Sequence, residues 1–304
     1  LTAAVERALA WGAATGRGLG FGLTTNGTTV TPAAVELLDS IDARVTVSLD
    51  GDRRAHDRHR RDRRGRGSYD AALRGLRALA ERCDVTVRAT VGGPDPDPEA
   101  VCDHVWSLGL PRVGIATADV PAGDPSALDD VALERLWGGM QALAGRYREQ
   151  ALAGRHLGLT NLDGLLRSVH RGVNRDHPCG AGIRLLACDV DGGLHTCHRL
   201  VGADGHRVGD LEHGFSPGRQ ERIAALSLAA RPGCAGCWAR HLCGGGCYHA
   251  HHVTTAAPGG DPLPVCRWLR RWMHTGLELY AELSLHSPGF LHEFIDPMPA
   301  SPVE

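Results

Sequence analysis

Residues Gly20–Gly51 read GFGLTTNGTTVTPAAVELLDSIDARVTVSLDG, and this stretch decides the fold. Two β-prone runs, Gly20–Thr25 and Arg44–Leu49, lie on either side of an amphipathic segment of helical length, Pro32–Ser40. The Thr-Pro pair that opens this segment suits an N-cap followed by the first helical position. The order strand, helix, strand predicts a βαβ unit with parallel strands.

The same alternation continues to residue 117. Further strands are predicted at Val85–Val91 and Arg112–Thr117, and further helices at Ser68–Cys83 and Pro98–Leu108. Because the strands are mostly apolar, we expect a parallel sheet that helices cover on both faces. Four strands are too few to close an eight-stranded barrel. They can form the larger part of a (β/α)6 barrel.

The bulk composition narrows the class of protein. The chain has 304 residues, of which 42% are hydrophobic and 22% charged, with 33 basic against 35 acidic residues. A net charge of −2 shows no excess of basic residues of the kind that nucleic-acid binding requires. No apolar run is long enough to span a membrane, so we expect a cytoplasmic protein. The start at Leu1, without an initiator Met or a signal-peptide pattern, leads us to expect a missing N-terminal part.

Polar residues follow the first two strands. Asn26 comes directly after Thr25, and Asp50 comes shortly after Ser48. In parallel α/β folds, ligands bind at the carboxyl ends of strands. The Asn-Gly and Asp-Gly pairs also favour ordinary tight turns, and both interpretations stay open.

A basic stretch follows the second of these turns. Asp52–Gly67 contains eight arginines and two histidines, and its glycines predict a loop. The loop is either solvated or lies over an anionic ligand, since guanidinium groups pair well with carboxylates and phosphates.

The ten cysteines are unevenly distributed. Only Cys83 and Cys102 precede residue 179, and both are expected to be ordinary buried thiols. The other eight lie between Cys179 and Cys266. Such a cluster, beside a cysteine-poor α/β half, predicts metal ligands in a reducing compartment rather than a disulfide framework.

Seven of these eight cysteines form an ordered set. Cys179 and Cys197 flank a predicted β-hairpin that turns at Asp191–Gly193, with Cys197 on its second strand. The other five are a Cys-x2-Cys-x5-Cys-x3-Cys quartet and a cysteine at the start of a predicted helix: Cys234, Cys237, Cys243, Cys247 and Cys266. Seven thiolates suit one four-cysteine and one three-cysteine site, which either zinc or iron–sulfur clusters accept.

Three further side chains lie near this set in sequence. Cys188 is expected to be a half-buried structural thiol, with a ligand role as the alternative. His198 and His249 each follow a cysteine of the set directly. Either imidazole is a hydrogen-bond donor to cluster sulfur, a proton-transfer group or simply exposed.

The cysteine spacing resembles the SPASM domain of radical S-adenosylmethionine (radical SAM) peptide and protein maturases. The spacing is Cys179-x12-Gly192-x4-Cys197, then the quartet, then Cys266. The N-terminal half resembles the same enzymes through short motifs in the family's order: Leu23–Gly27, Val47–Gly51, Ala55–Arg60, Gly67–Tyr69 and Val87–Val91. The resemblance therefore covers nearly the whole chain.

This resemblance implies a domain order and a set of cofactors. Residues 1–125 would form part of a (β/α)6 radical SAM barrel, 126–175 a helical connector, and 176–304 a SPASM module with C-terminal helices. The barrel would bind S-adenosylmethionine through Asn26, Ser48, Arg60 and Arg88. The module would hold two auxiliary [4Fe-4S] clusters. The outer one would use Cys234, Cys237, Cys243 and Cys266, and the inner one Cys179, Cys197 and Cys247.

The chain departs from the family in two respects. The Cys-x3-Cys-x2-Cys motif of the catalytic cluster is absent, and so is a Gly-Gly-Glu-Pro strand end; in the family, both lie upstream of where this chain begins. A fragment is therefore expected, rather than a degenerate homologue. Anaerobic sulfatase maturases carry Asp where this chain has His198, which makes His198 a candidate catalytic base and favours a peptide-crosslinking maturase.

The function implied is that of a peptide-modifying enzyme. A 5′-deoxyadenosyl radical would abstract hydrogen from a ribosomally made peptide or protein, with flavodoxin or ferredoxin as the reductant. No nucleic-acid or membrane partner is expected. The alternative is a zinc-stabilised, non-catalytic protein that binds a peptide or serves as a scaffold.

Overall fold

The computed structural model describes residues 1–121, 123–254 and 265–297. The chain divides into two compact units. The first contains Leu1–Ala118 and Glu134–Asp163, and the second contains Asp119–Leu133 and the chain from Gly164 onward. The helical connector expected at 126–175 is divided between the two units, and the boundaries expected at 125 and 175 stay predictions.

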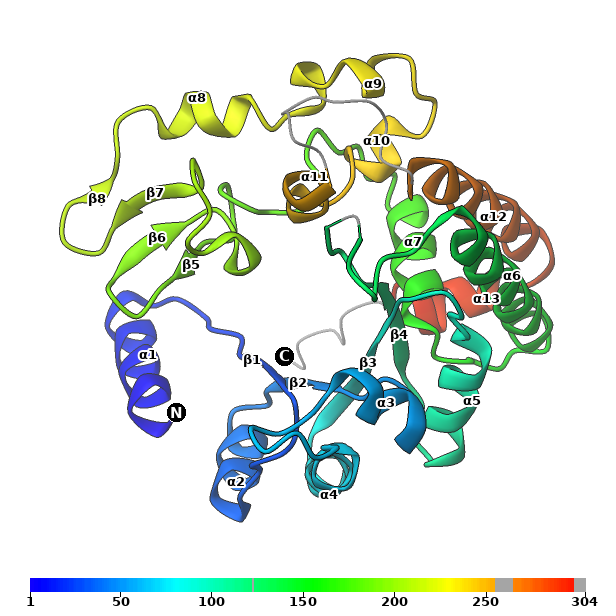
Figure 1. Ribbon diagram of the computed structural model, residues 1–304, viewed down its shortest axis with the longest axis horizontal. Helices are drawn as coiled ribbons and strands as arrows, with labels where there is room; N and C mark the ends of the chain where they lie inside the picture. The colour runs from blue at the N-terminus through cyan, green and yellow to red at the C-terminus, as the bar shows by residue number, and fades with distance from the viewer. Residues whose placement is uncertain (122, 255–264, 298–304) are drawn as a thin grey trace, which may run out of the picture. The chain divides into compact units, whose positions relative to one another are not determined.

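A parallel sheet forms the centre of the first unit (Figure 1). Its strands lie side by side in chain order: β1 (Gly22–Thr25), β2 (Arg44–Ser48), β3 (Asp84–Val91) and β4 (Val113–Thr117). All three pairings are parallel, and the sheet is open. An α/β fold with part of a barrel is therefore confirmed.

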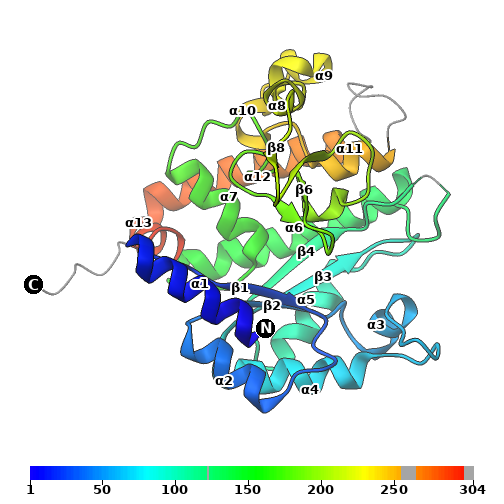
Figure 2. The ribbon, with the colours of Figure 1, turned by 90° about the vertical axis from the view of Figure 1, so that its left-hand side faces the viewer.

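The first unit also contains the following helices: α1 (Thr2–Thr15), α2 (Pro32–Ser40), α3 (Arg53–His59), α4 (Tyr69–Ala80), α5 (Pro98–Ser107), most of α6 (Asp130–Leu152) and the start of α7 (Thr160–His170). Helix α4 contacts β2 and β3, and α5 contacts β3 and β4. Helix α2 lies beside α4 below the strands in Figure 2.

One face of the sheet is polar, which corrects the expectation of apolar strands covered on both sides. Burial alternates along β3, where Val85, Val87, Ala89 and Val91 are buried. Residues of the other face are only partly buried or exposed, and the parallel register brings them side by side: Thr24 with Thr46 and Thr86, and Ser48 with Arg88. A sheet that surrounds a ligand needs one such accessible face.

The basic stretch is partly helical rather than a plain loop. The Asp52 side chain accepts a hydrogen bond from the Ala55 amide at 2.8 Å and so caps α3. Thr31 caps α2 as predicted, accepting from the Ala34 amide. Ser68 occupies the N-cap position of α4, but its hydroxyl makes no capping bond.

The centre of the second unit is a small antiparallel sheet. Its strands are β5 (Ala187–Cys188), β6 (Gly193–His195), β7 (Arg207–Asp210) and β8 (Gly214–Phe215), in that order. The predicted hairpin is present, with Gly192 at φ +81° in its turn. Cys197 lies beyond the end of β6, whose last residue is His195, rather than on a strand.

Short helices and one long helix follow this sheet. They are α8 (Arg219–Ala224), α9 (Pro232–Ala235), α10 (Arg240–Cys243), α11 (Tyr248–Thr254), α12 (Val265–His286) and α13 (Pro288–Phe290). A 3₁₀ turn at Leu228–Ala230 and a π-helical turn at Leu291–Ile295 accompany them, and another 3₁₀ turn, His198–Leu200, lies between β6 and β7. Within the described ranges, no helix is both long and apolar enough to cross a membrane.

Candidate functional site

The candidate site of the first unit is built around an ion pair between Arg60 and Asp50. The Arg60 Nε lies 2.5 Å from Asp50 Oδ2, and its Nη2 lies 3.1 Å from Oδ1. Asp50 is 7% exposed and also accepts a 2.8 Å hydrogen bond from the Thr90 amide. Asp50 therefore fixes the end of the basic stretch to the region where β2 and β3 end.

A buried histidine connects the same segments. His56 Nδ1 accepts a hydrogen bond from the Asp50 amide at 3.3 Å, so the ring proton lies on Nε2, 3.1 Å from Ser68 Oγ. The Ser68 hydroxyl donates in turn to the Arg60 carbonyl at 3.0 Å. Burial lowers the pKa of His56, outweighing the nearby Asp50 carboxylate, and so favours the neutral ring.

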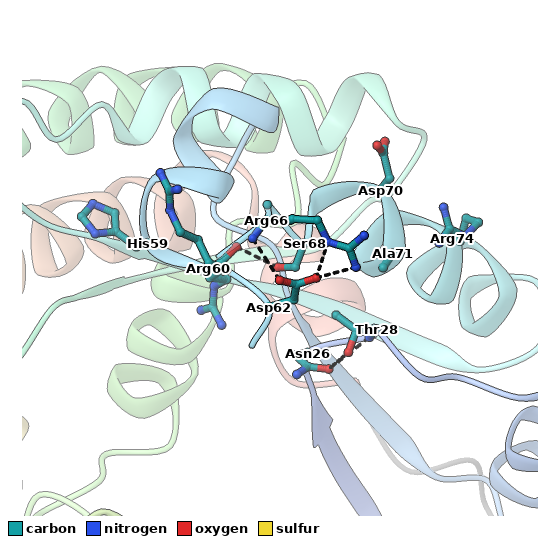
Figure 3. A pocket seen from close by; sticks show the side chains of 12 residues that line it. Asn26, Thr28, His59, Arg60, Asp62, Arg66, Ser68, Asp70, Ala71 and Arg74 are labelled. Carbon is teal, nitrogen blue, oxygen red and sulfur yellow. Dashed lines mark hydrogen bonds and ion pairs between the residues drawn. The ribbon is translucent and has the colours of Figure 1, made fainter. Parts of the chain in front are cut away.

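A pocket of about 560 Å³ opens beside this network (Figure 3). This volume is in the usual range for small-molecule sites. Its lining comes from the β1–α2 turn, the end of α3, the loop that follows and the first turns of α4: Asn26, Thr28, His59, Arg60, Arg61, Asp62, Arg66, Gly67, Ser68, Asp70, Ala71 and Arg74.

Several of the pocket's charges are already paired. Asp62 binds Arg66 at 2.8 Å, and Asp70 binds Arg53, which lies outside the lining. Arg74 has no ion pair with any residue that the structure describes. The pocket therefore retains positive charge after internal pairing, which suits an anionic group.

The four residues expected to contact S-adenosylmethionine fall into two pairs. Asn26 and Arg60 line the pocket. Ser48 and Arg88 are register partners on the open face of the sheet and do not line it. Asn26 also serves the turn, because its Oδ1 accepts from the Thr28 amide at 3.0 Å. The turn and the ligand interpretations of Asn26 are thus compatible.

The cysteines of the second unit form no disulfide bonds. None of the chain's ten cysteines forms a disulfide, and all ten lie in described residues. Cys179 and Cys247 are exposed, whereas the other five of the seven-cysteine set are half-buried. Cys188 is exposed too, which corrects the expectation of a half-buried thiol. Cys102 is a buried thiol, as predicted, and burial raises its pKa to about 12. Cys83, also expected to be buried, is half-buried.

Three cysteines of the quartet are close enough to affect one another. Burial raises the pKa of the Cys234 thiol; Arg231 opposes this effect, and Cys243 and Cys237 add to it. In the described parts of the chain, no three His, Cys, Asp or Glu side chains converge closely enough to hold one metal ion. Four thiols at this spacing form a donor set that either a zinc ion or an iron–sulfur cluster accepts.

The glycines of the quartet adopt the conformation that only glycine accepts readily. Gly244, Gly245 and Gly246 have φ angles of 74°, 93° and 78°. A Cβ on Gly244 would lie 2.6 Å from the His177 carbonyl oxygen. The loop thus passes close to the backbone just before Cys179, and this approach depends on glycine.

The histidines that follow the cysteines differ in environment. His198 is exposed, with Nδ1 3.9 Å from Cys197 Sγ. His249 is half-buried, and its Nδ1 has no partner among the described residues. Burial, followed by the Arg199 charge, lowers the pKa of His249. Arg199 is paired with Asp119 at 2.7 Å, an interaction that the spacing of the sequence did not predict.

Comparisons with known proteins identify the class of the chain. Residues 2–105 match the family model described as "Radical SAM superfamily". The matched segment contains β1, β2 and β3 of the open sheet and the residues that line the basic pocket, so the predicted resemblance to radical SAM enzymes is confirmed over this segment.

A curated relative of the chain is a maturating enzyme by name. The chain is 26% identical over 239 residues to the serine-type anaerobic sulfatase-maturating enzyme of Klebsiella aerogenes, a match that covers 74% of this chain and 57% of the relative. The chain thus spans less than two thirds of that protein's length.

The fold is also similar to solved structures. Native anSMEcpe with bound AdoMet superposes with a TM-score of 0.72 at 15% identity, covering 88% of this chain and 76% of the other. The structure of anSMEcpe with AdoMet and the Cp18Cys peptide gives a TM-score of 0.73. Streptococcus suis SuiB bound to S-adenosylmethionine gives 0.52 at 14% identity, covering 81% of this chain and 59% of the other. These likenesses establish the fold.

Proposed function

We propose that this chain belongs to a radical SAM maturase that modifies or crosslinks residues of a ribosomally made peptide or protein. The observation that carries the proposal is the basic pocket beside the end of β1, in a radical SAM domain that one chain joins to a seven-cysteine module. Ligands of open α/β sheets bind at this edge. The relatives whose names describe sulfatase maturation and a bound peptide support the substrate class.

The pocket and the adjoining sheet face would bind S-adenosylmethionine. Arg60 offers a guanidinium that Asp50 holds in one orientation, and the Ser68 hydroxyl fixes the Arg60 backbone through its carbonyl oxygen. The amide nitrogen of Asn26 points from the β1 turn, where its oxygen is already bonded to Thr28. Ser48 and Arg88 would contact the part of the cofactor that lies over the open sheet face. Such preorganised donors orient an anionic ligand at low entropic cost.

The cysteine module would hold the auxiliary clusters. Cys234, Cys237, Cys243 and Cys266 are proposed for the outer cluster, and Cys179, Cys197 and Cys247 for the inner one. Free thiols, mutual proximity in the quartet and close backbone approach at the glycine loop fit thiolate-ligated clusters. When bound, these clusters and S-adenosylmethionine would supply the radical and electron-transfer chemistry. No residue is assigned to the catalytic cluster, because the chain contains no Cys-x3-Cys-x2-Cys set.

The remaining parts of the proposal concern substrate chemistry and partners. His198 is exposed beside Cys197 and is proposed as the base that accepts a substrate proton. A flavodoxin or ferredoxin would supply electrons. We expect a reducing, cytoplasmic compartment, in which ten cysteines without a disulfide are usual.

Cofactor content tests the proposal directly. The chain should be purified and reconstituted anaerobically, and its iron, sulfide, zinc and visible spectrum should be measured. About eight iron and eight sulfide per chain are expected for two [4Fe-4S] clusters. Calorimetry should detect S-adenosylmethionine binding that weakens in Arg60→Gln but not in Arg77→Gln, an exposed α4 residue outside the pocket lining. Zinc without a chromophore would contradict the assignment.

A further inference from the structure

Arg231 is a buried cation that no carboxylate of the described residues neutralises. It is 8% exposed, the only arginine among the buried residues that the structure describes. No Asp or Glu in the described ranges forms an ion pair with it, whereas Arg60 and Arg66 of the first unit's pocket each have such a partner. Arginine stays protonated in proteins, so it cannot escape this environment by losing its proton.

Two contacts hold the guanidinium in place. Its Nη1 donates to the Gly245 carbonyl at 2.5 Å. Its central carbon lies 4.9 Å from the centre of the Tyr248 ring, over the ring face. A carbonyl dipole and an aromatic face attract a cation, but neither carries a charge that neutralises it.

Arg231 lies near residues of both proposed ligand groups, the outer and the inner cluster. On one side, Arg231 acts electrostatically on Cys234, three residues along the chain. On the other side, the Tyr248 ring beneath it belongs to the apolar cluster against which Cys197 packs, and Cys179 acts on the same tyrosine. Gly245, its hydrogen-bond partner, lies between Cys243 and Cys247.

A buried, unpaired charge costs several kcal/mol unless something compensates it. The anions available to Arg231 are the thiolates of the cysteine set, because no carboxylate is in reach among the described residues. Thiolate-ligated clusters carry net negative charge, and local positive charge is one of the factors that set their reduction potential.

We propose that Arg231 is a built-in counter-charge for the thiolate-ligated clusters of this module. The inference rests on the proposed function and adds a residue that nothing in the cysteine spacing indicates. The guanidinium stabilises the ligated, anionic state and favours addition of an electron. It is a positioning and tuning residue, since it acts on the clusters through their ligands.

The test compares Arg231→Gln, Arg231→Lys and Arg240→Gln with the wild-type chain. Arg240 belongs to the same module, is half-exposed and donates to the Ala235 carbonyl, so its removal changes net charge equally. After reconstitution, each variant is titrated with dithionite under EPR. Arg231→Gln should shift the auxiliary-cluster potential to more negative values, Arg231→Lys should shift it less, and Arg240→Gln should leave it near the wild-type value.

The proposal is overturned if Arg231→Gln loads both clusters and titrates like Arg240→Gln. It is also overturned if Arg231→Lys loses as much of its cluster content as Arg231→Gln does. The shape of the guanidinium, rather than its charge, would then matter. Circular dichroism of each variant separates loss of loading from loss of folding.

The outcome is distinguishable from failure of the proposed function. If the wild-type chain takes up only zinc, the maturase proposal fails, and chelator competition measures the counter-charge instead. A zinc–thiolate site is also anionic, so Arg231→Gln should bind zinc about 10- to 100-fold more weakly, as for other residues that support metal ligands. Equal zinc affinity in Arg231→Gln and Arg240→Gln would overturn the counter-charge in that case.

Discussion

Asp50 binds the Arg60 guanidinium at two points, Nε–Oδ2 at 2.5 Å and Nη2–Oδ1 at 3.1 Å. Asp50 lies two residues after the end of β2, and Arg60 directly follows α3. Because Asp50 is buried and also accepts the Thr90 amide, the pair joins three segments of the radical SAM domain beneath its pocket.

Replacing Asp50 by Asn should destabilise the first unit. The neutral amide retains the shape but loses the charge-assisted bonds to Arg60, so we expect a loss of about 1.5–3 kcal/mol in the free energy of unfolding. Urea denaturation followed by circular dichroism measures it. Asp70→Asn breaks the exposed pair with Arg53 and should cost less than about 1 kcal/mol. Equal losses in the two variants would contradict a special role for Asp50.

Stability should fall in mildly acidic solution partly because of His56. Its pKa is about 6.5 when unfolded and lower when folded. Above about pH 6.5 the ring is neutral in both states, and no stability is lost. As pH falls below that value, the unfolded chain takes up the proton first, so stability decreases until the folded pKa is passed.

The matched variant for this pH dependence is His56→Gln, which cannot be protonated. Its urea midpoint should decline less between pH 8 and pH 5.5 than that of the wild-type chain. His206, His249 and His251, whose pKa values burial also lowers, remain in the variant and account for a residual decline. Parallel declines in the two proteins would show that His56 does not contribute.

Gly75 should not tolerate a methyl group. A Cβ at this α4 position would lie 1.9 Å from the Gly27 carbonyl oxygen, in the turn that follows Asn26. We expect Gly75→Ala to cost about 1–3 kcal/mol although alanine favours helices, because backbone must move. Gly145→Ala, on α6 with open space around it, should be neutral or stabilising by about 0.4–1 kcal/mol. Thermal melts of the two variants should therefore shift in opposite directions.

Serine substitutions of Cys237 and Cys188 should distinguish a cluster ligand from a thiol that binds no cluster. Cys237→Ser should halve the iron and sulfide content, to about four of each per chain, because it removes a ligand of the outer cluster. Cys188→Ser should leave the content unchanged, since this exposed thiol is outside the proposed set. A loss in Cys188→Ser would identify it as the missing ligand of the inner cluster.

Local sequence signals predicted the regular elements well. The helix expected at Pro32–Ser40 has these bounds. The four strands of the parallel sheet begin and end within two residues of their predicted positions. Helix α3 was missed, because glycines later in the basic stretch suggested a loop and the capping role of Asp52 was not recognised. Ser68 opens the segment predicted to be helical, but its hydroxyl is bonded to the Arg60 carbonyl rather than capping α4.

The sequence by itself determined the class of fold, the family and the set of candidate cysteines. These depend on periodicity and spacing, which are properties of the chain as written. Only the tertiary structure decided that one sheet face is polar, that Asn26 and Arg60 share a pocket, that Cys188 is exposed and that Arg231 is buried without an acid. Exposure and charge pairing depend on residues far apart in the chain. No local pattern encodes them, and folding alone brings those residues together.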